Sequence, residues 1–238
     1  MIFHSLAFLA FFVSVFVIYW ALPHRWQNLF LLAASWFFYG CVTWWWLLPF
    51  AMTTVLDWQC ALRMDQAAPD RRKRWLLLSL VCNLGMLGYF KYGGFFMTNV
   101  ATLWHSMGWG AEPALLHFVV PAGISFYTFQ SMSYVVDVWR GALKPCRKLT
   151  DYALFVSFFP QLVAGPIERA GHLLSQVRGV RQFPWNRATG ALTLMLWGYL
   201  LKLVVADNAA LSAGKVFSLA EPSFPILWSG VLAFAVQI

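Results

Sequence analysis

The residues best placed to do chemistry form a polar stripe inside an apolar stretch. In GISFYTFQSMSYVVDVWRG, spacings of three and four separate Gly123, Tyr127, Gln130, Tyr134, Asp137 and Gly141. Residues spaced in this way share one face of an α-helix. Phenol, amide and carboxyl groups on such a face could orient a polar ligand, so this helix is a candidate lining for a substrate tunnel. The same face could instead only hold helices together, and Asp137 could pair with Arg140 at the membrane boundary.

A second candidate is the segment LFVSFFPQLVAGPIER. Pro160, Gly165 and Pro166 cannot continue a regular helix, so backbone amides and carbonyls beside Gln161 would be free to meet a ligand. A tight cytoplasmic turn explains Gly165 and Pro166 equally well. Gln161, Gly165 and Pro166 therefore join the candidates for the mouth of the tunnel.

The composition indicates that a membrane surrounds these segments. Of the 238 residues, 61% are hydrophobic and only 11% are charged, whereas a soluble domain has about 25% charged residues. The net charge of +8 accompanies a mean hydropathy of +0.64. Nucleic-acid binding needs a solvated basic surface, so we expect no nucleic-acid partner and take the lipid bilayer as the partner instead.

Several charge-free stretches have a length close to the ~20 residues that a helix needs to span a membrane. They predict an all-α polytopic membrane protein with a single membrane domain over 1–238. The predicted spans lie near 5–22, 27–42, 44–62, 75–104, 118–139, 189–206 and 222–238. The fourth span contains Lys91 and several glycines, among them Gly88 and Gly93, so it can break into two pieces.

The basic clusters give the orientation, because Lys and Arg in short loops stay in the cytoplasm. With the N-terminus outside, in the periplasm, the clusters at 63–74 and 140–148 both become cytoplasmic. A full crossing at 150–167 would put the next arginines outside, so this segment is predicted to be re-entrant. The stretch 171–187 mixes arginines with Leu, Phe and Trp, as amphipathic segments at a membrane interface do.

Several segments then occur in a familiar order. They are SWFFYG, GYFKYGGFF, VPAGISFYTFQSMSYVVDVWRG, LFVSFFPQLVAGPIER and LWGYLLKLVVADNAA. Through them the chain resembles the membrane-bound O-acyltransferase family, in its bacterial branch that O-acetylates alginate. The resemblance implies a helical bundle around a tunnel in the bacterial inner membrane. Through that tunnel an acyl group, expected to be acetyl, would move from a cytoplasmic thioester towards a hydroxyl acceptor on the far side.

The resemblance also carries expectations about substrates and partners. The donor would be acetyl-CoA or another acyl thioester, with no bound cofactor and no metal. The acceptor would be an exported polysaccharide, reached with a periplasmic partner protein. Arginines could attract the donor's phosphates or could only hold the chain to anionic lipid; they are Arg169, Arg178, Arg181 and Arg187. Of these, Arg169 follows the broken segment directly and joins the tunnel candidates.

The family's essential histidine, with an upstream asparagine, belongs to a Trp-Arg-Arg-Trp-His type of segment that is absent here. We therefore expect the catalytic residues to lie beyond Ile238, and this chain to be an N-terminal portion that is inactive alone. No histidine or cysteine spacing suggests a metal site. Two other functions remain open: a secondary transporter, although no inverted repeat is visible, and a non-catalytic scaffold of a polysaccharide-export complex.

Overall fold

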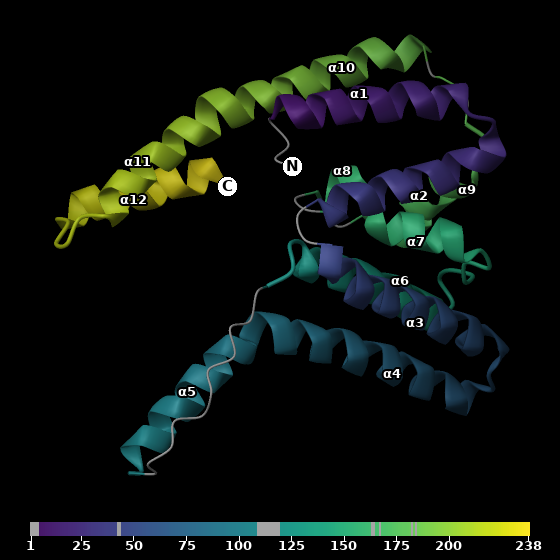
Figure 1. Cartoon of the computed structure of the whole chain (residues 1–238), viewed down its shortest axis with the longest axis horizontal. Coiled ribbons are helices and arrows are strands. Elements are labelled where there is room, and N and C mark those ends of the chain that lie inside the picture. The colour runs from purple at the N-terminus through teal and green to yellow at the C-terminus, as the bar shows by residue number, and fades with distance from the viewer. Residues whose placement is uncertain are drawn as a thin grey trace. The chain divides into compact units, whose positions relative to one another are not determined.

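The structure is a computed structural model that describes residues 5–41, 44–108, 120–162, 165–166, 168–181, 183 and 185–238. Within these residues every regular element is helical, as the sequence predicts (Figure 1). The chain divides into two compact units, Met1–Arg181 and Gln182–Ile238, and each is described by itself.

The first unit begins with three helices that follow the predicted apolar runs. They are α1 (Leu6–Ala21), α2 (His24–Gly40) and α3 (Leu47–Gln66), and a short 3-10 turn, Trp44–Trp46, precedes α3. The hydroxyl of Ser5 caps α1 by accepting a hydrogen bond from the backbone N–H of Phe8 at 3.1 Å. Pro23 has no N–H to donate and directly precedes α2, so it separates the two helices.

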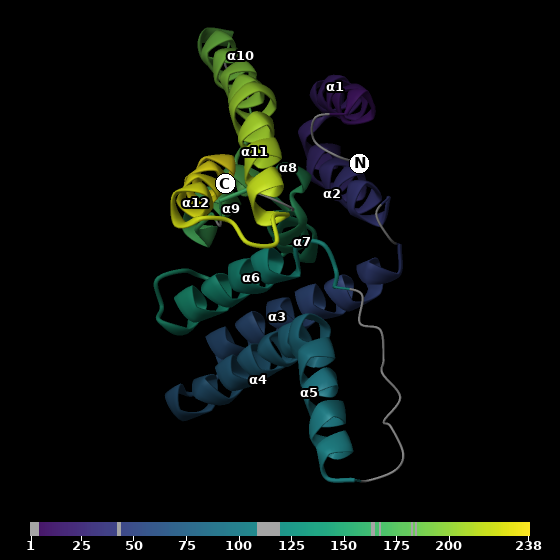
Figure 2. The same ribbon diagram turned by 90° about the vertical axis from the view of Figure 1, so that its left-hand side faces the viewer.

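The fourth predicted span is a long helix with an interruption. α4 (Pro69–Leu87) and α5 (Gly93–Ser106) are joined by a π-helical segment, Gly88–Tyr92. The chain changes direction at this segment, as both Figure 1 and Figure 2 show. Wider π turns commonly accompany kinks, and glycines flank this one on both sides. The bend therefore lies where the sequence analysis allowed the span to break.

The candidate residues lie on the next four helices, which are α6 (Ile124–Trp139), α7 (Leu149–Ser157), α8 (Phe159–Leu162) and α9 (Ala170–Arg178). Gly123 and Gly141 bound α6 with φ angles of +74° and +75°, a backbone region that suits glycine. Every residue from Asp151 to Ser157 in α7 is buried. α7 is packed against α2, α3, α6 and α9, so it forms the centre of this unit.

The broken helix at α7 and α8 is short. With nine residues, α7 extends about 14 Å, well below the ~30 Å hydrocarbon thickness of a bilayer. Phe158 interrupts the helix, and Pro160 lies in the single turn of α8. A helix of this length suits a re-entrant segment at 150–167, which remains a prediction.

Two segments differ most from the sequence prediction. The interfacial segment predicted for 171–187 is helical only to Arg178, because the chain becomes extended at Gly179. The span predicted for 189–206 begins earlier and continues farther, as one helix from Trp185 to Phe217. This helix comprises α10 (Trp185–Leu200), a π-helical segment (Leu201–Ala206) and α11 (Asp207–Phe217).

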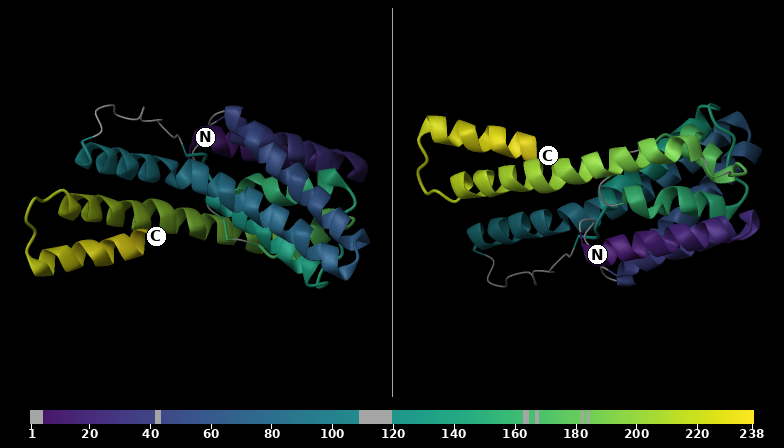
Figure 3. Two further views of the ribbon diagram at one scale, coloured as in Figure 1. Left: turned by 90° about the horizontal axis from the view of Figure 1, so that it is seen from below. Right: turned by 90° about the horizontal axis from the view of Figure 1, so that it is seen from above.

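The second unit ends in a helical hairpin. α12 (Phe224–Gln237) folds back beside α11 (Figure 3). The two helices meet closely at Gly230, where an added Cβ would lie 2.6 Å from a Val216 methyl carbon. In the described residues of this unit only Ala213 and Gly230 are buried, so its apolar side chains are left for lipid or other parts of the protein.

Membrane character is visible in helix length and exposed side chains. Two helices, Pro69–Ser106 and Trp185–Phe217, are long and apolar enough to cross a bilayer, and α1 and α12 are shorter apolar helices. Val13 and Val17 of α1 are 50% and 60% exposed, as expected for side chains that meet lipid. The structure is thus that of a helical membrane protein, while the number of seven spans stays a prediction.

Candidate functional site

The polar stripe on α6 lies inside the first unit. Gln130 is 3% exposed and donates from Nε2 to the backbone carbonyl of Phe155 in α7 at 2.8 Å. Its Oε1 accepts a hydrogen bond from Nε2 of Gln161 in α8 at 3.0 Å. The two predicted glutamines therefore meet, and they connect α6 to both halves of the broken helix.

Tyr134, one turn farther along α6, fixes the chain that leads into α7. Its hydroxyl accepts from the backbone N–H of Cys146 at 2.8 Å, while the Cys146 carbonyl accepts from Nε1 of Trp58 at 2.7 Å. Its ring packs on Tyr152 with centroids 4.6 Å apart. The role of Tyr134 in this structure is thus to position α7 against α3 and α6.

A buried carboxyl group lies between α3 and α4. Asp57 has no exposed surface, and its Oδ1 accepts from the hydroxyl of Ser79 at 2.6 Å. The amide Nδ2 of Asn83 donates to Oδ1 and Oδ2 at 2.8 and 2.9 Å. These partners of Asp57 were not predicted from the sequence. Ser79 and Asn83 are four residues apart within an apolar run, so they share one helix face, and that spacing could have found them.

Three tyrosine hydroxyls, those of Tyr39, Tyr127 and Tyr152, are buried, and among the described residues they have no hydrogen-bond partner in good geometry. Tyr39 and Tyr127 lie next to each other, and Tyr152 lies beside Ser131. A buried hydroxyl without a partner costs about 1–3 kcal/mol, so such groups favour the arrival of water or a ligand. Tyr127 is thus the stripe residue whose hydroxyl a substrate could engage, in place of its weak contact with the Tyr39 hydroxyl.

The remaining predicted residues lie at the edge of this network. Asp137 is half-buried; it and Arg140 both belong to the described chain, and they form no ion pair. Gly165 lies directly against Gln161, because a Cβ at residue 165 would approach the Cα of Gln161 to 2.5 Å. Pro166 and Arg169 are exposed, and Arg169 directly precedes α9. The structure therefore brings Tyr127, Gln130, Tyr134, Gln161 and Gly165 together and leaves the other three outside.

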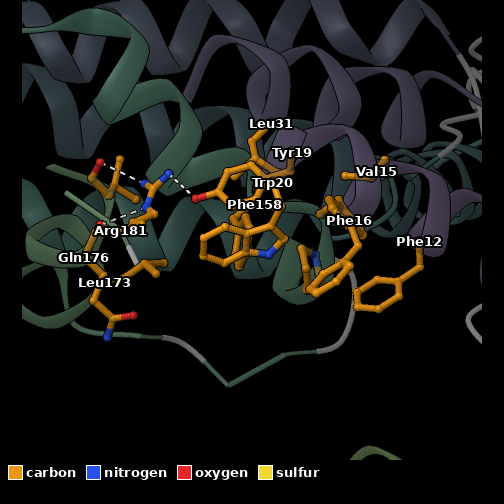
Figure 4. Close-up of a pocket in the computed structure, with 13 residues that line it drawn as sticks. Phe12, Val15, Phe16, Tyr19, Trp20, Leu31, Phe158, Leu173, Gln176 and Arg181 are labelled. Atoms are coloured by element: carbon orange, nitrogen blue, oxygen red, sulfur yellow. Dashed lines mark hydrogen bonds between the residues drawn. The ribbon is translucent and has the colours of Figure 1, made fainter. Parts of the chain in front are cut away.

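A separate hollow of about 290 Å³ lies beside α1 (Figure 4). Its walls are mainly aromatic, with Phe12, Phe16 and Trp20 along one side. At one end the Arg181 guanidinium donates to the Tyr19 hydroxyl at 2.6 Å and to the Val177 carbonyl at 2.8 Å. These walls suit an apolar chain, so this hollow is distinct from the polar network of α6–α8.

Histidines and metal ligands contribute nothing to the polar network in the described part of the chain. His24, His105 and His172 are all exposed. In the same residues no group of three or more His, Cys, Asp or Glu side chains could hold a metal ion. The network can therefore bind and orient a substrate through amides and hydroxyls, but among the described residues it holds no imidazole to act as a base.

The whole chain is similar to curated bacterial proteins. It is 37% identical to the probable alginate O-acetylase AlgI of Azotobacter vinelandii and 38% identical to that of Pseudomonas aeruginosa, over 100% of this chain and 48% and 46% of those proteins. The peptidoglycan O-acetyltransferase of Helicobacter pylori is 33% identical over 89% of this chain and 44% of its own length. The chain thus spans about half the length of these relatives. No family model matches it, and no solved structure matches it either.

Proposed function

This chain is a member of the membrane-bound O-acyltransferase family, and on that premise we propose that the full protein O-acetylates an exported polysaccharide. The proposal depends on one observation: relatives named for alginate and for peptidoglycan O-acetylation are both similar to the chain over most or all of its length. Both polymers carry hydroxyl groups and both lie outside the cytoplasm. The protein would be an enzyme of the bacterial inner membrane, with a periplasmic protein completing delivery to the polymer.

In the proposed reaction, a hydroxyl oxygen attacks the thioester carbonyl carbon, the new C–O bond forms and the C–S bond breaks. The hydroxyl proton leaves through a base and ends on the departing thiolate. Among the described residues no histidine is buried, and we propose that the base belongs to the rest of the full-length protein. This half would contribute the path of the acyl group, which would run along Tyr127 and the hydrogen-bonded Gln130 and Gln161.

The direct test is complementation. The complete gene would be expressed in an alginate-producing bacterium that lacks its own alginate O-acetylase, and the O-acetyl content of the secreted alginate would be measured. We expect acetylation to return. If the protein reaches the membrane and neither alginate nor peptidoglycan gains acetyl groups, the proposal is wrong.

Tyr127→Phe should separate substrate contact from packing. Among the described residues the Tyr127 hydroxyl contacts only the Tyr39 hydroxyl, in poor geometry, so its removal should change thermal stability little. Loss of one substrate hydrogen bond should lower acetyl transfer about tenfold. Tyr134→Phe is the matched control, because it removes a hydroxyl bonded to Cys146 and should lower stability. If the Tyr127→Phe variant keeps full acetyl transfer, the Tyr127 side chain serves packing and does not contact the substrate.

The proposed orientation has its own test. With the N-terminus in the periplasm, a cysteine at Arg178 should react with a membrane-impermeant maleimide only from the cytoplasmic side. A cysteine at Ser106, the last residue of α5, should react only from the periplasmic side. Labelling of intact cells and inside-out vesicles measures both. The opposite pattern would refute the orientation.

A further inference from the structure

Three cationic side chains gather around a pocket of about 400 Å³ in the first unit. They come from separate parts of the chain: Arg25 from the start of α2, Lys148 from just before α7, and Arg178 from the end of α9. His24 and Thr150 add a ring nitrogen and a hydroxyl to the same lining. The fold thus places donors from three segments around one space.

Within the described residues, Arg25, Lys148 and Arg178 form no ion pair. Asp151 is the carboxylate of this lining; it is 7% exposed, and its Oδ1 accepts from Nδ2 of Asn28 at 2.9 Å. Positive side chains therefore outnumber negative ones, and a bound anion would relieve their mutual repulsion.

One helix end adds to the positive potential. α2 begins at the pocket with His24 and has no side-chain cap, whereas the first turn of α7 already carries the Asp151 carboxylate. The N-terminal end of a helix carries partial positive charge and presents backbone N–H groups to anions. Arginine adds paired donors that match phosphate oxygens. The pocket therefore combines several features that favour a phosphate group.

We propose that this pocket binds the phosphate groups of the thioester donor, a nucleotide of the coenzyme A type. The inference rests on the proposed function and adds the place where the donor docks. In the proposed orientation the α1–α2 turn, the segment before α7 and the end of α9 all face the cytoplasm, where such donors are found. The volume lies within the usual range for small-molecule sites, roughly 300–1,000 Å³.

An acidic phospholipid carries the same phosphate chemistry, so the experiment must separate the two sources. The full-length protein would be placed in nanodiscs of phosphatidylcholine alone, and binding of coenzyme A and of 3′,5′-ADP would be measured by calorimetry. In parallel, nanodiscs that also contain phosphatidylglycerol would be analysed by native mass spectrometry for retained lipid.

Both nucleotides should bind in phosphatidylcholine, more weakly at higher salt. Arg178→Gln and Lys148→Gln should each weaken binding about tenfold. Arg147→Gln is the matched control, because Arg147 is exposed and adjacent to Lys148 but does not line the pocket; it should change binding by less than about twofold. If a variant does not give folded protein, Arg25→Gln replaces it, since Arg25 is exposed at the start of its helix.

Equal nucleotide binding by all variants would overturn the inference, as would failure of both nucleotides to bind. Loss of phosphatidylglycerol retention in Arg178→Gln without any nucleotide binding would assign the pocket to lipid instead. Neither 3′,5′-ADP nor coenzyme A carries an acyl group, so binding does not depend on transfer. Nucleotide binding without acetyl transfer would therefore refute the proposed function alone, and transfer without nucleotide binding at this pocket would refute this inference alone.

Discussion

Asp57→Ala is expected to destabilise the protein by about 3 kcal/mol, among the largest effects of any single substitution in this chain. The carboxyl group of Asp57 is fully buried and accepts hydrogen bonds from Ser79 and Asn83. Its removal leaves the Ser79 hydroxyl and one Asn83 donor without acceptors and opens a cavity between α3 and α4. The thermal unfolding midpoint of the purified full-length protein should therefore fall by several degrees.

Two variants control for the general effect of changing an aspartate in this helix. Asp65→Ala makes the same replacement in α3 at an exposed position, and it should leave the midpoint nearly unchanged. Asp57→Asn keeps the side-chain volume and one acceptor oxygen, so it should lower the unfolding midpoint by an intermediate amount. Equal midpoints for Asp57→Ala and Asp65→Ala would show that the buried network does not hold α3 to α4.

Gly165→Ala is expected to reduce acetyl transfer about 100-fold or more. The new methyl group would lie 2.5 Å from both Cα and Cβ of Gln161, so the backbone has to move. Such a movement pulls the Gln161 amide away from Gln130, to which it donates at 3.0 Å. Displacement of a positioning group by about 1 Å can cost an enzyme roughly 100-fold in rate. The O-acetyl content of the secreted polysaccharide measures the effect.

Gly171→Ala is the matched control for this substitution. Gly171 lies in α9, where an added Cβ meets nothing within 4 Å, and alanine favours the helix. This variant should keep full transfer at an unchanged protein level. If the Gly165→Ala variant transfers acetyl groups as well as the Gly171→Ala variant does, the contact between Gly165 and Gln161 does not position the residues along the acyl path.

Sequence patterns predicted the helical elements well wherever a proline or a charged residue bounded an apolar run. The run at 5–22 became α1, Leu6–Ala21, and the run at 222–238 became α12, Phe224–Gln237. The stripe on α6 was also predicted as one helix face, and Tyr127, Gln130 and Tyr134 are all buried there. In these cases neighbours along the chain determine the outcome, so spacing alone is informative.

Contacts between distant segments could not be predicted in this way. The meeting of Gln130 with Gln161, and of Tyr134 with Cys146, depends on how α7 packs against α6. The helix Trp185–Phe217 was predicted too short because charges usually mark the end of a span. Here a π-helical turn brings Lys202 within 2.5 Å of Asp207, and the paired charges allow the helix to continue.

The full-length protein is proposed to transfer an acetyl group from a cytoplasmic thioester to an exported polysaccharide. The most direct test uses inside-out membrane vesicles that contain the full-length protein and enclose the polysaccharide, with acetyl-labelled coenzyme A added outside. We predict that label becomes esterified to the enclosed polymer, and that this transfer falls about tenfold in Tyr127→Phe. Absence of label on the polymer in vesicles that hold folded protein and its periplasmic partner would show that the protein does not carry out this transfer.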